Sequence, residues 1–311
     1  MAKQPLVPRP GDERARRPAV PGSDGSGWRS ALFAFVPLWL AAVLTLTVTG
    51  HGVVAALLVA NAGLLAVLVL LTRRLTSTPR APTHESPRSR TTLPWQLGAI
   101  AVVVVLTGAG AADVPLWSAL VAWGHALGES ILDVRWVGGP GNAIANPLQY
   151  LIVPLAVLLA LGARPSGLGF GRGRGVGVTS LVWIAVPALV AAVALATGAL
   201  TGPRLVARTL ANTLQNGPFE EFLFRGALQT RLGLLLPVPW AILLQALVFG
   251  LWHLRSATDA MGGDPFAAVA FCIASQTVSG LAFGFVFWRT GNLVAPSVAH
   301  VALNVMGQTL G

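Results

Sequence analysis

Polar and ionisable side chains gather in the last third of the chain, within stretches that are otherwise apolar. A charged side chain near the centre of a membrane costs about 2.5–3.5 kcal/mol on insertion scales, so a cluster of them indicates function. Carboxylates, imidazoles and an amide are the groups that hydrolases use to move protons and to stabilise an oxyanion. The set consists of Glu220, Glu221, Arg225, His253, His300 and Asn304.

Spacing gives the two glutamates different roles. On a helix, Glu221 and Arg225 stand at i and i+4 on one face, in the acid-first order that favours an ion pair. Glu220 is rotated by about 100° and has no partner within that helix. An unpaired carboxylate in a poorly hydrated place accepts a proton readily, which suits a general base supported by the neighbouring ion pair. A plainer explanation is that both acids complement the start of a helix at Gly217-Pro218.

Two histidines and an asparagine follow on later apolar segments. A lone histidine such as His253 is more often a core residue than a catalyst. His300 and Asn304 again stand at i and i+4, and their plainer role is an interhelical hydrogen-bond pair worth about 0.6 kcal/mol. The combination of two carboxylates, two imidazoles and an amide on three helices favours a hydrolytic site instead.

The elements that must position these residues are membrane helices. Of the 311 residues, 54% are hydrophobic and 10% are charged, whereas soluble domains carry about 25% charged residues. Several apolar stretches reach the length of about 20 residues that a transmembrane helix needs. We therefore expect an all-α fold, a polytopic transmembrane helical bundle with about 8–9 spans. The segment 114–130 is apolar but short, and it is either a short span or an interfacial helix.

Four regions are predicted along the chain. Sequence rich in Pro, Ser and Arg favours a disordered segment over a packed one. Arginines on both outer flanks of the first two apolar stretches predict that the N-terminus is cytoplasmic. The regions are a disordered cytoplasmic tail (1–30), a transmembrane helical hairpin (31–72), a Pro/Arg-rich linker (73–95) and a membrane-embedded core (96–311).

The net charge of +10 does not predict nucleic-acid binding. The excess is greatest in the first 90 residues, where retention on the cytoplasmic side explains it, and no basic domain with a packed core is apparent. The single cysteine, Cys272, excludes an internal disulfide and a cysteine-rich zinc site.

The polar motifs resemble those of the CPBP family of intramembrane proteases, which includes the CAAX prenyl endopeptidases and the bacteriocin-processing or Abi proteins. The likeness covers residues 210–308, about a third of the chain. It implies that the core (96–311) is a helical protease with a catalytic cavity inside the membrane. The motifs are, in order, EExxxR from Glu220 to Arg225, FxxxH from Phe249 to His253 and HxxxN from His300 to Asn304.

Carried over by position, the resemblance implies that Glu220 and His253 activate a water, while His300 and Asn304 stabilise the oxyanion. The family has also been described as metal-dependent, and Glu220, His253 and His300 are then the candidate ligands of a divalent metal such as zinc. The chain has no HExxH helix, and asparagine is a poor zinc ligand. We therefore prefer a site that requires no cofactor.

The expected partners are a peptide or membrane-protein substrate and the lipid bilayer. All but one of the 21 Lys and Arg residues are Arg, which is typical of GC-rich prokaryotic genomes, so we expect an integral protein of a prokaryotic cell membrane. The alternative function is a non-catalytic membrane binding, immunity or transport protein that uses the same polar cluster for recognition.

Overall fold

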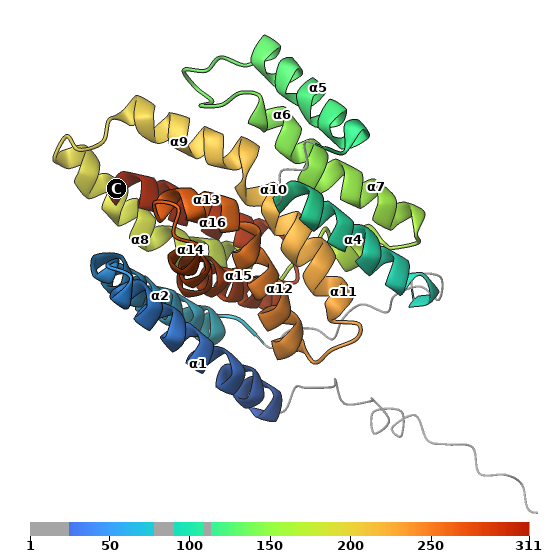
Figure 1. Ribbon diagram of the computed structural model, residues 1–311, viewed down its shortest axis with the longest axis horizontal. Coiled ribbons are helices and arrows are strands. Elements are labelled where there is room, and N and C mark those ends of the chain that lie inside the picture. The colour runs from blue at the N-terminus through green and yellow to red at the C-terminus, as the bar shows by residue number, and fades with distance from the viewer. Residues whose placement is uncertain (1–24, 78–89, 109–112, 311) are drawn as a thin grey trace, which may run out of the picture.

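The computed structural model describes residues 25–77, 90–108 and 113–310, and every regular element in these ranges is a helix. The expected all-α class is therefore confirmed (Figure 1). Most of the predicted tail (1–30) and the middle of the predicted linker (73–95) lie outside the described residues.

Five described helices are long and apolar enough to cross a membrane, or six if one bent pair forms a single span. A shorter apolar helix, Leu93–Gly108, adds to these. The result is compatible with the expected polytopic bundle of about 8–9 spans. The five candidate spans are Ser26–Val48, Gly52–Leu75, Asn142–Ala160, Val176–Ala196 and Pro265–Thr290.

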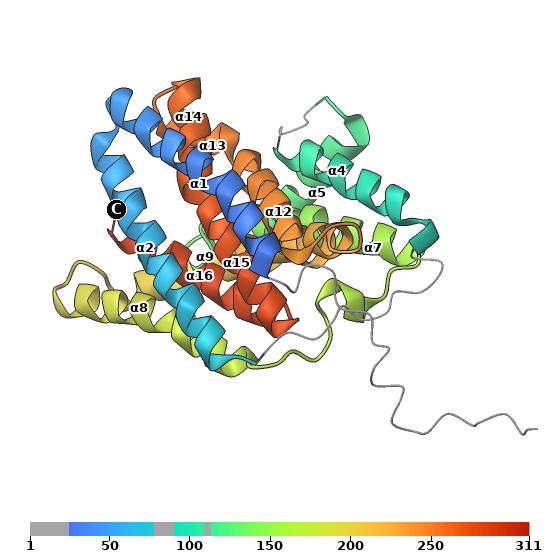
Figure 2. The ribbon, with the colours of Figure 1, turned by 90° about the horizontal axis from the view of Figure 1, so that it is seen from below.

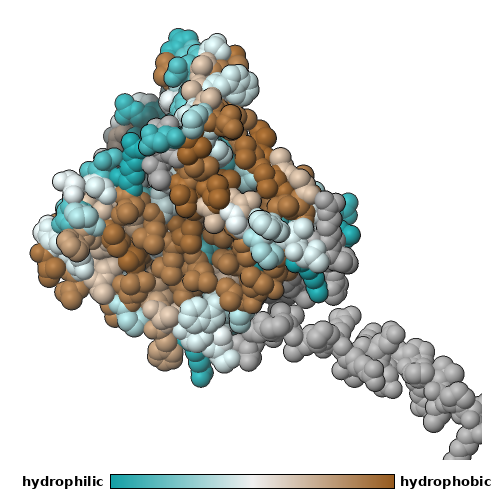
Figure 3. Space-filling model, turned by 45° about the vertical axis from the view of Figure 1, so that its right-hand side comes forward, coloured by the Kyte–Doolittle hydropathy of each residue, from teal (hydrophilic) through white to brown (hydrophobic). Residues whose placement is uncertain are grey.

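The outer surface has the character of a lipid-facing one. Phe33 is 79% exposed and Leu181 is 70% exposed, and both lie on candidate spans. Figure 3 shows a broad hydrophobic face, with hydrophilic atoms gathered toward its margins. Since water would not favour such an apolar surface, the protein is an integral membrane protein.

The first two helices form a hairpin along one side of the bundle (Figure 2). They are α1 (Gly25–Val48) and α2 (Gly52–Leu75), joined by a turn in which Gly50 has φ +87°. Helix α1 packs against α14 (Pro265–Phe271), and α2 packs against α15 (Val278–Thr290).

A second group of helices covers the opposite side of the bundle (Figures 1 and 2). The ambiguous segment 114–130 is a helix of 17 residues there and is not among the candidate spans. The group consists of α4 (Leu93–Gly108), α5 (Pro115–Ile131), α6 (Asn142–Pro147), the π-helical turn η2 (Leu148–Ile152) and α7 (Val153–Ala160).

The C-terminal helices lie between these two groups (Figure 1). Two helices precede them, α8 (Val176–Ala196) and α9 (Gly202–Gln215). The central helices are α10 (Gly217–Glu221), the π-helical η4 (Phe222–Gln229), α11 (Thr230–Leu232), α12 (Val238–Trp252), α13 (Leu254–Ala260), α14, the π-helical η5 (Cys272–Thr277), α15 and α16 (Val294–Leu310).

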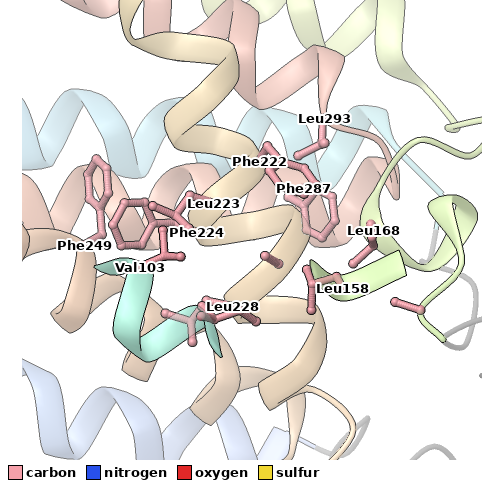
Figure 4. Packing of buried hydrophobic residues seen from close by; sticks show 13 residues of the cluster. Val103, Leu158, Leu168, Phe222, Leu223, Phe224, Leu228, Phe249, Phe287 and Leu293 are labelled. Carbon is pink, nitrogen blue, oxygen red and sulfur yellow. The ribbon is translucent and has the colours of Figure 1, made fainter. Parts of the chain in front are cut away.

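An apolar core surrounds η4 and fixes its direction. Phe222, Leu223 and Phe224 are all fully buried or nearly so, at 0–1% exposure. Figure 4 shows Leu223 and Phe224 close to Phe249 from α12 and Val103 from α4, whereas Phe222 lies beside Phe287 from α15. Because three consecutive side chains of η4 are packed in apolar surroundings, the core surrounds η4 on every side. This packing also fixes the position of Glu220 and Glu221, which directly precede η4.

Candidate active site

The two glutamates lie where helix α10 crosses helix α16. Gly217 begins α10, and a Cβ added there would lie only 2.6 Å from Cγ2 of Val301. The glycine therefore allows the two backbones to approach closely. One turn later, Glu220 is 5% exposed and Glu221 is fully buried. The close crossing brings both carboxylates beside His300 of α16.

Glu221 forms the centre of a buried chain of charges. Its Oε1 lies 3.1 Å from Nη1 of Arg225, and both side chains are 0% exposed. The same Oε1 lies 2.8 Å from Nδ1 of His300. Since a carboxylate can only accept, Nδ1 of His300 donates this hydrogen bond. Glu221 therefore holds the imidazole of His300 in place by its Nδ1 atom.

Arg225 is held by aromatic rings and a backbone carbonyl. Its guanidinium carbon lies 4.4 Å from the ring centre of Phe249 and 5.4 Å from that of Phe283. Its Nη2 donates to the carbonyl of Gly280 over 3.4 Å. The π-helical segment η4 carries this arginine, and such segments are frequent at functional sites.

His253 lies at a break between two helices. Helices α12 and α13 meet there at an angle of 51°. Nδ1 of His253 is 2.8 Å from the carbonyl oxygen of Phe249, which can only accept, so Nδ1 carries the hydrogen. The other ring nitrogen, Nε2, lies 3.8 Å from Oε2 of Glu220. With 19% of its side chain exposed, His253 is the more accessible of the two histidines.

The two imidazoles converge on one carboxylate oxygen. Nε2 of His300 is also 3.8 Å from Oε2 of Glu220. This oxygen is buried and has no hydrogen-bond partner among the described protein atoms. A separation of 3.8 Å is too long for a direct hydrogen bond but suits two groups that share a small polar molecule. The ring of His300 stacks on Phe283 at 5.0 Å, which fixes its plane.

Asn304 takes part in a neighbouring network rather than in these contacts. It follows His300 by one turn of α16. Its Nδ2 donates to Oδ1 of Asn212 on α9 over 3.1 Å. Polar atoms of five of the six residues singled out from the sequence thus lie 2.8–3.8 Å from one another in a connected chain, and Asn304 lies beside them.

Several neighbours of the site carry no signal in the sequence motifs. Asn212, Gly280 and Phe283 lie outside the three motifs. Gln245 is fully buried, and its Nε2 donates to the carbonyl of Gly280 over 2.9 Å. Its sequence signal was a polar residue in the apolar stretch that also carries His253.

The donor set fits a metal only in part. Two imidazole nitrogens and a carboxylate are ligands that zinc accepts. However, the described residues contain no group of three or more His, Cys, Asp or Glu side chains arranged to hold a metal ion.

A hollow adjoins the break at His253. It is about 510 Å³ in volume and is lined by residues on both sides of the break, Leu251 and Leu254, together with Gly108 of α4. Arg255 and Thr258 of α13 complete its lining. The hollow therefore lies next to the more exposed of the two histidines.

Comparison with known proteins places the site within one family segment. Residues 202–306 match the family model described as type II CAAX prenyl endopeptidase Rce1-like. No curated protein and no solved structure gives a match. The matched segment contains all six residues singled out from the sequence. Residues 202–306 of this integral membrane protein are therefore similar to the Rce1-like type II CAAX prenyl endopeptidases, and this similarity supports a protease.

Proposed function

We propose that the protein hydrolyses a peptide bond of a peptide or membrane-associated protein, with Glu220 as general base. The observation that carries this proposal is the convergence of two imidazole Nε2 atoms on Oε2 of Glu220, each at 3.8 Å. Each imidazole is anchored through Nδ1 to an acceptor, so both Nε2 atoms are directed to the same place.

Glu220 and His253 together would hold the attacking water. With Nδ1 donating to Phe249, Nε2 of neutral His253 carries a lone pair that accepts one hydrogen of the water. Glu220 accepts the other hydrogen and takes it as the water oxygen bonds to the scissile carbonyl carbon. General-base assistance of this kind contributes about 10²–10⁴-fold to the rate.

His300 and Asn304 would stabilise the negative charge on the former carbonyl oxygen. His300 can donate from Nε2 when both ring nitrogens are protonated, and the Glu221 carboxylate at 2.8 Å from Nδ1 compensates that charge. In this state two carboxylates face Arg225 and one imidazolium, so the buried charges balance. One N–H of Asn304 is bound to Asn212, and the second is available to the oxyanion.

The intermediate then breaks down by returning the proton. Glu220, now a carboxylic acid, gives its proton to the leaving nitrogen as the carbon–nitrogen bond breaks. The products are one chain ending in a carboxylate and one beginning with an amine. The hollow beside His253 is the approach that we propose for the substrate, since this histidine is the more exposed one.

We propose that the protein works in a prokaryotic cell membrane with its N-terminus in the cytoplasm. We also propose that the reaction needs no metal. Nε2 of His253 and Oε2 of Glu220, 3.8 Å apart, can hold one water between them, which supports direct water activation. Cleavage should therefore persist in protein treated with a chelator. Cleavage that is lost on chelation and restored by zinc, with one zinc retained per chain, would overturn the metal-free mechanism.

The test of the function compares protein termini by mass spectrometry in membranes from cells that carry different variants. We expect new termini with the wild type and with Glu129→Gln, a matched change at an exposed position on α5. We expect none with Glu220→Gln or without the protein. If all variants are present at equal level and no terminus depends on Glu220, the alternative of a membrane binding, immunity or transport protein is favoured.

A further inference from the structure

Helix α9 buries two amide side chains and leaves two large apolar side chains exposed. Val206 is 47% exposed and Leu210 is 37% exposed. In contrast, Asn212 is 1% exposed and Gln215 is 7% exposed. Burying a primary amide costs free energy unless its hydrogen bonds are made inside the protein. The buried amide of Asn212 therefore calls for a specific set of partners.

The partners of Asn212 fix the direction of its amide. Its Nδ2 donates to the carbonyl of Arg208 over 2.8 Å and to Oε1 of Gln308 over 3.1 Å. Its Oδ1 accepts from Nδ2 of Asn304 over 3.1 Å. Rotating the amide by half a turn would oppose acceptors with acceptors and donors with donors. Only one orientation satisfies all three neighbours, and it presents an acceptor to Asn304.

We propose that Asn212 is a positioning residue that holds the amide of Asn304 in the direction needed for the oxyanion. This inference rests on the role proposed for Asn304. The NH₂ group of Asn304 has two hydrogens in one plane, and binding one of them to Asn212 directs the other. Without this acceptor, the Asn304 side chain is free to rotate, so its donor is no longer prepared in advance.

A second contact between α9 and α16 provides a matched control. Nη1 of Arg208 donates to Oγ1 of Thr309 over 3.3 Å, beyond the site-facing part of α16. This contact also joins the two helices but does not involve Asn304. If Asn212 served only to hold the helices together, loss of either contact would act on the site in the same way.

The experiment is a double-mutant cycle on the full-length protein in liposomes, read out by single-turnover cleavage and by steady-state kcat and KM. The substrate is a peptide spanning a cleavage site identified from the new termini. Asn212→Leu removes the hydrogen-bond acceptor and keeps a side chain of similar volume. Asn212→Ala is a second variant in case the first does not fold. We expect either to lower kcat about 10–100-fold with KM unchanged. Thr309→Val should retain wild-type kcat.

The cycle decides whether Asn212 acts through Asn304. In an Asn304→Ala background, loss of Asn212 should lower kcat no further, because the group that it positions is gone. An equal fold loss in both backgrounds, or an equal loss with Thr309→Val, overturns the positioning role. Failure of the proposed function is distinguishable, because Glu220→Gln would then retain cleavage whatever the result for Asn212.

Discussion

Substitutions in the buried pair of Glu221 and Arg225 are expected to affect the stability of the protein and its cleavage activity differently. Both side chains are 0% exposed, and their charged atoms lie 3.1 Å apart. Removing one member of a buried pair leaves the other charge uncompensated and costs about 3–5 kcal/mol. Replacing Arg225 also removes the contact of its guanidinium with the Phe249 ring at 4.4 Å, and such a contact is worth up to about 2 kcal/mol when desolvated. We therefore expect Arg225→Met and Glu221→Gln each to destabilise strongly.

The double variant Glu221→Gln/Arg225→Met should behave differently from its parents. Independent losses would add up to about 6–10 kcal/mol, comparable with the total stability of many proteins. Because the double variant removes both charges of the pair and the introduced amide would still offer an oxygen to His300, we expect it to be no less stable than either single variant. The coupling free energy should therefore reach at least about 3 kcal/mol.

Activity should not recover together with stability. The neutral amide no longer compensates a protonated imidazole at His300, and it allows the wrong tautomer of that ring. By analogy with other oriented histidines, cleavage should stay about 10²–10⁴-fold below wild type. Stability is measured by denaturant unfolding in detergent micelles, followed by tryptophan fluorescence. Losses that simply add in the double variant would refute the buried-pair reasoning.

An exposed arginine gives the control for this experiment. Arg135 pairs with Asp133 in the loop after α5, with 80% of the Arg135 side chain exposed. The hydrogen-bonded guanidinium of Arg135 lowers the pKa of the Asp133 carboxyl to about 2. Since water already solvates both groups, Arg135→Met should leave the unfolding midpoint and the cleavage rate unchanged at neutral pH.

Two further substitutions test the packing that positions the site. Gly250→Ala would place a Cβ 2.1 Å from Oγ1 of Thr277, so we expect the free energy of unfolding to fall by about 1–3 kcal/mol and kcat to fall because the nearby end of α12 is displaced. Gly307→Ala should leave stability unchanged, because the space around Gly307 is open. Equal effects of the two substitutions would contradict the close packing of α12 against η5 at Gly250. Trp183→Phe removes the 2.9 Å hydrogen bond to Thr72 that joins α8 to α2. We expect the free energy of unfolding to fall by about 1–3 kcal/mol and KM to stay the same. An unchanged unfolding midpoint would show that this hydrogen bond does not stabilise the hairpin.

Helix positions and local pairs could be predicted from the sequence because they depend on near neighbours. The Pro and acids at the start of α10 indicated a helix start there, and the i, i+4 spacing brings Glu221 beside Arg225. The all-helical membrane class followed from the shortage of charged residues. The approximate span count followed from the lengths of the apolar stretches.

The features that required the structure depend on contacts between distant segments. The Nδ1 anchor of His300 comes from Glu221, 79 residues earlier, and no local pattern encodes it. Helix α9 carries both polar and apolar residues, and its sequence pattern alone does not say which of them face the protein. In α9, Asn212 is buried while Val206 and Leu210 are exposed, the reverse of the usual burial preference, so the contact of Asn212 with Asn304 could not be predicted from the pattern. The π-helical turns likewise depend on packing around them.

The role of Glu220 as general base is tested most directly with purified, chelator-treated protein in liposomes. The single-turnover rate of peptide cleavage is measured for the wild type, Glu220→Gln and Glu129→Gln. A general base predicts that Glu220→Gln lowers the rate about 10²–10⁴-fold at an unchanged unfolding midpoint, while Glu129→Gln cleaves like the wild type. A rate for Glu220→Gln within a few-fold of the wild-type rate would contradict that role.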